Sequence, residues 1–176
     1  MKDRVDHLRV AMSQGQMRTD VVRRFYECFA RHDAEGMAAC YADDVVFSDP
    51  VFQHLRGRDA GDMWRMLCER AKGDLVVVAS DIAVDESGAG HAHWVARYRF
   101  GPARRTVVNR IKATFRFDGN DRIVEHTDRF DLWRWSRMAL GLPGVLLGWS
   151  PLLQNKVRAR ANQGLKRFQD QRMSTR

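Results

Sequence analysis

Two ionisable residues in one strand-like segment are the first candidates for chemistry. The segment from Ile123 to Trp133 follows a turn-forming Asp-Gly-Asn-Asp sequence. Because successive side chains of a strand point to opposite faces, His126 and Asp128 share one face with two apolar residues, Val124 and Phe130. Burying ionisable groups among apolar ones costs several kcal/mol unless they are paired or hydrogen-bonded. The pattern therefore predicts either a pocket where Asp128 and His126 exchange protons, or a buried, hydrogen-bonded structural pair.

The carboxyl group of Asp49 is a further candidate, because it ends an apolar segment and directly precedes Pro50. Aspartate before proline is also a common way to start a turn, so an acid/base role and a turn-forming role both fit. His54 lies in the segment that follows. It is interpreted either as a residue that closes a pocket or pairs with Asp49, or as an exposed loop residue.

The spacing of apolar residues along the chain predicts helices in the first part and strands in the second, and these elements must position the candidate residues. Apolar residues recur at helical spacing before Gly73 and alternate after it, with short turn-rich connections between the alternating runs. This order predicts the α+β class, with four strands paired as an antiparallel meander. The expected helices are 19–30, 33–41 and 59–70, and the expected strands are 43–50, 75–84, 91–100, 106–117 and 122–133.

One of these strands has the residues for a pocket wall. Within 91–100, a period of two places Trp94, Ala96 and Tyr98 on the same face. A large aromatic ring, a small neighbour and a phenol with a polar tip suit an apolar ligand. Ordinary core packing explains the same pattern, so both interpretations stay open.

Length and charge bound the class of protein. A chain of 176 residues is long enough for one domain with a substantial core. Residues 131–176 contain nine Lys and Arg and two acidic residues, a net charge of +7, which leaves +1 of the total +8 for the preceding 130 residues. The basicity therefore belongs to a C-terminal segment, and we expect no nucleic-acid partner.

The sequence lacks the residue patterns of several other kinds of functional site. Cys28, Cys40 and Cys68 have no metal-ligand spacing and are interpreted as reduced packing thiols of a cytoplasmic protein. His91 and His93 alternate like strand ligands, but no third ligand follows, so no metal site is expected. The sequence has no phosphate-binding loop, nucleophile motif or dinucleotide fingerprint, and no cofactor is expected. Polar and charged residues fill the first twenty positions, so no signal peptide is expected.

A longer stretch resembles a known superfamily. The segment "VRRFYECFARHDAEGMAACYADDVVFSDPVF", followed by "LRGRDA" and the four-strand meander, resembles the nuclear transport factor 2-like proteins over about residues 19–132. This superfamily includes ketosteroid isomerase, limonene epoxide hydrolase and the SnoaL-like polyketide cyclases, and the longer chain is most similar to a bacterial subgroup. The resemblance implies a cystatin-like cone of curved antiparallel sheet wrapped on the N-terminal helices, a deep pocket, and dimerisation through the sheet.

The resemblance to ketosteroid isomerase is incomplete at the site. Asp49 falls on the position of that enzyme's general base. The oxyanion-hole tyrosine falls on Phe25, with Tyr26 one residue away and about 100° round the helix. The oxyanion-hole aspartate falls on Lys112 or Ala113, neither of which is a neutral acid. The resemblance therefore does not imply a steroid isomerase.

The resemblance to limonene epoxide hydrolase is better at one position. "DRFD" from Asp128 matches the segment with that enzyme's catalytic aspartate, and Arg110 lies near its bridging arginine. Its acid carboxyl again falls on Lys112 or Ala113 and is absent here. If Lys112 pointed inward, its charge would lower the pKa of a neighbouring aspartate and favour an acidic ligand. SnoaL-like cyclases need one acid/base aspartate, which Asp128 can supply.

The C-terminal segment combines an apolar stretch with a basic helix. The apolar run 138–153 is interrupted by glycine and proline and is too short to span a bilayer. From Pro151, apolar residues recur at three- and four-residue spacing, with Lys and Arg mostly away from that stripe. The segment either closes one end of a pocket, the interpretation we favour, or lies weakly on an anionic membrane surface.

The sequence as a whole predicts three parts: an N-terminal arm (1–16), frayed or loosely helical, a nuclear transport factor 2-like domain (17–135), and a C-terminal extension (136–176). We expect a homodimer and an enzyme, a SnoaL-like cyclase/isomerase or an epoxide-opening hydrolase, acting on a small hydrophobic, oxygenated substrate. The alternative is a non-catalytic binding protein for a lipid-like ligand. The expected catalytic residues are Asp128, Asp49 and His126, and the expected substrate-binding residues are Tyr26, Trp94, Tyr98, Phe130 and His54.

Overall fold

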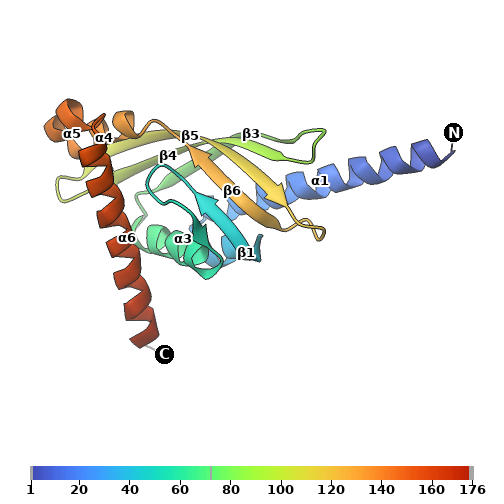
Figure 1. Ribbon diagram of the computed structural model, residues 1–176, viewed down its shortest axis with the longest axis horizontal. Helices are drawn as coiled ribbons and strands as arrows, with labels where there is room; N and C mark the ends of the chain where they lie inside the picture. Colours follow the sequence, from blue (N-terminus) through green and yellow to red (C-terminus); the bar gives the residue numbers. More distant parts are fainter. Residues whose placement is uncertain (1, 72, 175–176) are drawn as a thin grey trace.

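The N-terminal helix is longer than the sequence predicts. The computed structural model describes residues 2–71 and 73–174, with residues 2–13 described as backbone only. Helix α1 runs from Lys2 to Ala30, and its first half extends beyond the sheet (Figure 1). A helix start at Thr19 or Asp20 is therefore wrong. The Thr19 hydroxyl donates to the backbone carbonyl of Gly15 (2.8 Å) within the helix and does not cap a helix start. No proline interrupts residues 2–30, so the helix is continuous.

Two further helices precede most of the sheet. Asp33 caps α2 (Ala34–Ala38) by accepting from the backbone N–H of Gly36 (2.8 Å). The expected helix 33–41 is therefore too long, because β1 already begins at Tyr41. Helix α3 (Arg58–Ala71) buries one side against the core. The core lies between these helices and the concave face of the sheet, and it includes Phe25, Phe29, Phe47, Trp64 and Phe115.

The sheet confirms the predicted α+β cone. Its order is β2-β1-β6-β5-β4-β3, with β3 to β6 as the predicted antiparallel meander and β1 added parallel to β6. The parallel pair places the end of β1 beside the last strand. The strands are β1 (Tyr41–Ser48), β2 (Leu55–Arg56), β3 (Val76–Val84), β4 (Gly90–Phe100), β5 (Arg105–Phe117) and β6 (Ile123–Arg129).

The last strand is shorter than predicted. Strand β6 ends at Arg129, and the carboxylate of Asp131 accepts from the backbone N–H of Arg134 (2.9 Å), which caps helix α4 (Leu132–Leu140). A strand reaching Trp133 is therefore wrong, because an N-cap aspartate stabilises a helix start at this point. Helices α5 (Leu142–Leu147) and α6 (Pro151–Ser174) follow.

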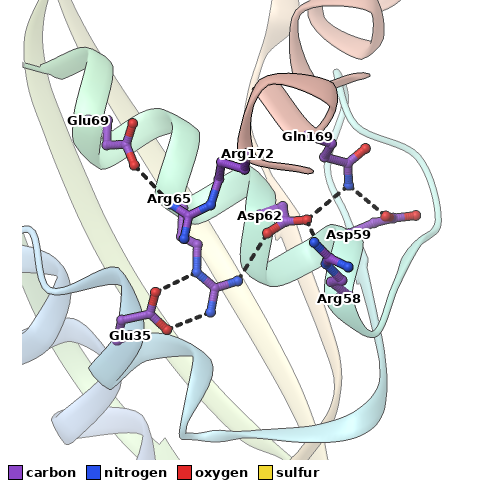
Figure 2. A network of polar contacts seen from close by, with 8 residues as sticks. All are labelled: Glu35, Arg58, Asp59, Asp62, Arg65, Glu69, Gln169 and Arg172. Carbon is purple, nitrogen blue, oxygen red and sulfur yellow. Dashed lines mark hydrogen bonds and ion pairs between the residues drawn. The ribbon is translucent and has the colours of Figure 1, made fainter. Parts of the chain in front are cut away.

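Helix α6 crosses the domain and packs on α3 (Figure 1). Its C-terminal half is joined to α3 by ion pairs and hydrogen bonds, among them Arg172 to Glu69 (3.2 Å) and Gln169 to Asp62 (3.1 Å). Arg65 of α3 extends this network to Glu35 of α2 (Figure 2). The extension is therefore attached to the domain along its own length.

The cysteines are buried and free. Burial raises the pKa of the Cys40 and Cys68 thiols to about 11, which keeps them protonated and weakly nucleophilic. Cys28 is also buried, as expected of a packing thiol. Among the residues described, no helix is long and apolar enough to cross a membrane, and no cluster of His, Cys, Asp or Glu has metal-site geometry.

Candidate active site

A cavity of about 750 Å³ lies between the concave face of the sheet, α3 and the C-terminal helices. Its volume is in the range of small-molecule sites. Its wall is mostly apolar and aromatic, with a few polar side chains. The sheet side contributes Asp49, Trp94, Ala96, Tyr98, Asn109, Ile111, Asp128 and Phe130; the C-terminal extension contributes Trp135, Leu140, Pro143, Leu153, Lys156, Val157, Arg160 and Ala161.

Asp128 is held on this wall by two N–H donors. Its side chain is nearly inaccessible to solvent, and Oδ1 accepts from Nε1–H of Trp94 and from Nε2–H of His126, each at 3.1 Å. No hydrogen bond reaches Oδ2 from any described residue, and Asp128 lines the cavity. A carboxylate oxygen that faces the cavity and is oriented through its partner can accept a proton from a ligand.

A chain of buried hydrogen bonds orients His126. Nε1–H of Trp64 donates to the Tyr41 hydroxyl (2.8 Å), and that hydroxyl lies 2.7 Å from Nδ1 of His126. Since the tryptophan can only donate, the Tyr41 proton is assigned to the bond with Nδ1. The remaining proton of a neutral imidazole is then on Nε2, where it donates to Asp128.

Aromatic rings enclose the same imidazole. His126 has no solvent exposure, and its ring centroid lies 4.3 Å from that of Phe115, 5.1 Å from Phe47 and 5.3 Å from Phe25. The indole of Trp64 is stacked on it at 6.0 Å. The packing fixes the ring, and His126 is not among the residues that line the cavity; it reaches the site through its hydrogen bond to Asp128.

Asp49 lies at the end of β1 on the same cavity wall, in a different environment. Its Oδ1 accepts from the backbone N–H groups of Val51 (2.6 Å) and Phe52 (2.5 Å). Burial raises the pKa of Asp49 to about 7; the two N–H groups oppose this shift and the charge of Asp128 adds to it. At neutral pH, a large fraction of Asp49 is therefore a neutral carboxylic acid that can give up a proton.

Tyr98 adds a hydroxyl to the same wall. It accepts from Nε1–H of Trp135 (2.8 Å) in α4, so its own O–H proton is free to donate into the cavity. Burial raises the pKa of Tyr98 to about 12, with the bond from Trp135 opposing the shift and the charge of Asp49 adding to it. The phenol is thus a hydrogen-bond donor and not a base at neutral pH.

The structure brings most of the predicted residues together. Asp49, Asp128, Trp94, Tyr98 and Phe130 line the cavity. His126 does not line the cavity and contacts Asp128 through the bond from Nε2–H to Oδ1.

Two predicted residues lie away from the described cavity wall. Tyr26 is buried beside Trp94, with ring centroids 6.0 Å apart, and its hydroxyl has no hydrogen-bond partner among the described residues. His54 lies exposed in the loop before β2 at φ 58°, with its backbone N–H donating to Ser48. A ligand contact by either residue stays a prediction.

The register of β5 resolves the position left open in the sequence. Ala113 is buried on the cavity side, directly opposite Asp128, whereas Lys112 is exposed on the outer face opposite Arg129. Arg110 also faces outward, and Asn109 lines the cavity. The residue of β5 that faces inward opposite Asp128 is therefore an alanine without a carboxyl group, and the other carboxyl group on the cavity wall is that of Asp49.

Several site residues were missed in the sequence. Tyr41 and Trp64 are not predicted, because nothing local in the sequence relates them to a histidine 85 residues from Tyr41. Asn109 alternates correctly with Ile111 on β5 and was detectable by the period of two. Trp135 is not predicted either, because helix α4 begins at Leu132, inside the expected strand 122–133.

The comparisons with known proteins identify the family of this chain. The model of the SnoaL-like domain matches residues 22–126, which is more than half of the chain. The chain belongs to the SnoaL-like family. A search of curated protein sequences found no match. The SnoaL-like match ends before Asp128 and before helices α4 to α6.

Solved structures share the fold at low identity. A polyketide cyclase candidate from Xanthomonas campestris pv. campestris is 23% identical (TM-score 0.58), over 71% of this chain and 98% of its own. An epoxide hydrolase from M. tuberculosis that resembles limonene epoxide hydrolase is 22% identical (TM-score 0.55), over 79% and 96%. SalBIII, an epoxide hydrolase/cyclase-like enzyme of pyran ring formation in the polyether salinomycin, is 12% identical (TM-score 0.59), over 66% and 92%. These likenesses confirm the nuclear transport factor 2-like fold.

Proposed function

We propose that this SnoaL-like protein is an enzyme that opens an epoxide, or a similar strained cyclic ether, of a hydrophobic small molecule by general acid–base catalysis. The observation on which this rests is the pair of carboxyl groups on one cavity wall in contrasting environments. The Asp128 carboxyl accepts hydrogen bonds from two N–H groups, whereas burial raises the pKa of Asp49 to about 7. Pairs of acids in such different surroundings suit opposite roles in proton transfer.

In the proposed reaction, Asp128 takes a proton from the O–H group of the nucleophile, which forms a new C–O bond to one epoxide carbon. The C–O bond on that carbon breaks, and the released oxygen takes the proton of Asp49, assisted by the Tyr98 hydroxyl. Return of a proton from Asp128 to Asp49 through water restores the starting state. With water as nucleophile the product is a diol, and with a hydroxyl of the same substrate it is a cyclic ether.

The names of two structural neighbours support this class of reaction. One is an epoxide hydrolase, and the other is an epoxide hydrolase/cyclase-like enzyme of pyran ring formation. The apolar wall suits the hydrocarbon part of such a substrate, while Asn109 and Tyr98 supply polar contacts for its oxygens. The Asp128–His126–Tyr41 chain supports the base by holding its carboxylate in one orientation.

The test is turnover of a panel of terpenoid and hydroxy-epoxides, followed by mass spectrometry in ¹⁸O-labelled water. One ¹⁸O per diol identifies hydrolysis, and an unlabelled isomer of the substrate identifies cyclisation. The Asp128→Asn variant should bind the substrate and not convert it. Conversion by this variant at the wild-type rate would refute the proposed role of Asp128.

A second candidate, non-catalytic carriage of a lipid-like ligand, is favoured by one observation on the extension. Apolar side chains of α5 and the start of α6 are exposed beside the cavity: Leu142 (76%), Leu146 (66%), Trp149 (62%) and Leu152 (82%). Exposed apolar patches of this kind often mark interaction surfaces. The interpretation that the extension closes the pocket agrees with Leu140, Pro143 and Leu153 on the wall, but these other side chains point away from it.

The carriage candidate predicts reversible membrane contact. Wild-type protein should sediment with vesicles that contain phosphatidylglycerol, and a Leu146→Glu/Trp149→Glu variant should remain in the supernatant. Substitutions are preferred to deletion of α6, because α6 is also a cavity wall. Absence of wild-type sedimentation would rule out this candidate.

A further inference from the structure

Three cations lie together on the helical side of the cavity. Lys156 and Arg160 of α6 line it, and so does Arg70 in the last turn of α3, whose guanidinium donates to the carbonyl of Gly164 (3.2 Å). Residues 156, 160 and 164 follow one another at four-residue spacing and so lie on one stripe of α6, with Arg70 bound to the backbone of Gly164 at its end. The three positive charges therefore lie within about two helical turns.

These cations have no acidic partner within the part of the chain that the structure describes. Lys156 and Arg160 are exposed and make no ion pair, and Arg70 has only the carbonyl of Gly164. Like charges at this spacing repel one another. The stripe therefore lacks a counter-charge at the place where the cavity meets solvent.

The other half of the same helix interface is different. Towards the C-terminal end of α6, charges on α2, α3 and α6 are matched: Arg65 pairs with Glu35 (2.6 Å) and Asp62 (3.1 Å), and Arg172 with Glu69 (3.2 Å), as Figure 2 shows. The chain thus balances charge along one half of the α3–α6 contact and leaves it unbalanced along the half that lines the cavity.

The stripe and the acid/base pair belong to different elements of the cavity wall. Arg158 donates to the carbonyl of Pro50 (2.9 Å), so its flank of α6 faces the loop after Asp49. Lys156 precedes Arg158 by two residues, which places it about 200° away round the helix, on the opposite flank. The apolar residues Leu153 and Val157 line the cavity. The cavity wall thus carries cations on its helical side and the two carboxyl groups on its sheet side.

We propose that the cavity binds an anionic amphiphile, with its carboxylate or phosphate held by Lys156, Arg160 and Arg70 and its apolar body directed towards Asp128. The proposal rests on the proposed acid–base function for the far end of the molecule, and it deepens that function by naming the substrate class. An anion offsets the repulsion among the cations and gains charge-assisted hydrogen bonds. The stripe lies outside the residues that match the SnoaL-like domain, so it belongs to the extension of this chain.

The test compares anionic and neutral probes of the same length on the full-length protein. Decanoate, decyl phosphate and decan-1-ol are titrated below their aggregation limits by calorimetry and by tryptophan fluorescence. The wild type should bind at least one of the two anions about tenfold or more tightly than the alcohol, and this preference should shrink as KCl is raised. The tighter anion identifies the head group as carboxylate or phosphate.

A matched pair of variants isolates the stripe. Lys156→Glu/Arg160→Glu should lose about tenfold or more in anion affinity and keep its affinity for decan-1-ol, which also shows that the fold is intact. Lys166→Glu/Arg167→Glu makes the same change of charge at exposed positions of α6 outside the cavity wall, and it should bind both probes as the wild type does. Equal affinity of wild type for anion and alcohol, or equal loss in both double variants, would overturn the proposal.

The outcomes separate this proposal from the proposed reaction. Selective anion binding without epoxide turnover would support the head-group site and refute the proposed reaction. Turnover of neutral epoxides without anion preference would keep the reaction and refute the head-group site. The Asp128→Asn variant should bind the anion as tightly as the wild type does.

Discussion

The two sides of the cavity are built in different ways. The inner wall, which we define as Asp49, Trp94, Tyr98 and Asp128, is formed by the sheet and the loop after β1. Each of its polar side chains makes at least one hydrogen bond within the protein. The outer wall, which we define as Leu153, Lys156, Val157, Arg160 and Ala161, is one face of α6, and its cations have no ion pair among the described residues.

This difference separates chemistry from recognition. Proton transfer needs groups held within a few tenths of an ångström, which the hydrogen-bond chain behind Asp128 supplies. Recognition of a charged head group needs a local excess of charge and tolerates mobile side chains. The inner wall is therefore expected to control turnover and stability, and the outer wall to control affinity.

The largest effect is expected at Asp128. Asp128→Asn removes the base and keeps the shape of the side chain, so kcat should fall by about 10³-fold or more, with little change in ligand affinity. Initial rates and calorimetry on the same preparation measure the two quantities. A loss of affinity as large as the loss of kcat would show that Asp128 binds the ligand and does not act as the base.

Asp49 should give a pH signature. As acid it must be protonated, so the wild-type rate should fall as the pH rises through about 7, and Asp49→Asn should lose about 10²-fold in kcat together with this pH dependence. A pH–rate profile from pH 5 to 9 measures it. A variant that keeps the wild-type profile would assign the titration to another group.

The same carboxyl should affect stability in a defined direction. Its folded-state pKa is raised, so between its ordinary value of 3.8 and about 7 the folded protein holds a proton that the unfolded chain releases. Its contribution to stability is therefore greatest at low pH and declines as the pH rises through this window. Urea unfolding at pH 5 and pH 8 should show a larger decline for wild type than for Asp49→Asn.

A smaller effect is expected behind the base. Tyr41→Phe leaves Nδ1 of His126 and Nε1–H of Trp64 without their partner, so the free energy of unfolding should fall by about 1–3 kcal/mol. On the outer wall, Lys156→Ala should change it by no more than about 0.5 kcal/mol. Urea unfolding compares the two, and equal effects would remove the distinction between the walls.

The smallest expected effect concerns the predicted homodimer through the sheet. The outer face of the sheet places Lys112 directly opposite Arg129, with Arg97 and Arg110 exposed nearby, so two such faces repel each other. We expect the dimer fraction to increase severalfold between about 50 and 500 mM KCl, as charges are screened. Light scattering after gel filtration measures it, and a dimer that weakens with salt would place the interface elsewhere.

The fold could be predicted from the sequence because the spacing of apolar residues changes clearly along the chain. Helical spacing before Gly73 and alternation after it give α3 and the meander to within a few residues, and the face of β4 with Trp94 and Tyr98 follows from the period of two. The prediction failed where one local contact decides the outcome, as at Asp131, whose capping bond turns the chain into a helix. Periodicity does not detect such a bond.

The site was predicted only in part, for two physical reasons. A shift of one residue exchanges the faces of a strand, so the choice between Lys112 and Ala113 needed the actual pairing of β5 with β6. Contacts between distant segments, such as Tyr41 with His126, leave no local pattern. The stripe of Lys156 and Arg160 was visible as charge, but its place on the cavity wall depends on how α6 packs.

The most direct test of the account is a titration of the aspartate side-chain carboxyls by ¹³C NMR in wild type, Asp49→Asn and Asp128→Asn. We expect one carboxyl group with a titration midpoint near 7, and we expect its signal to be absent in Asp49→Asn. Its midpoint should be lower in Asp128→Asn, because the neighbouring negative charge is gone. A wild type without a carboxyl that titrates well above the ordinary range, or one whose signal persists in Asp49→Asn, would contradict the acid–base pair.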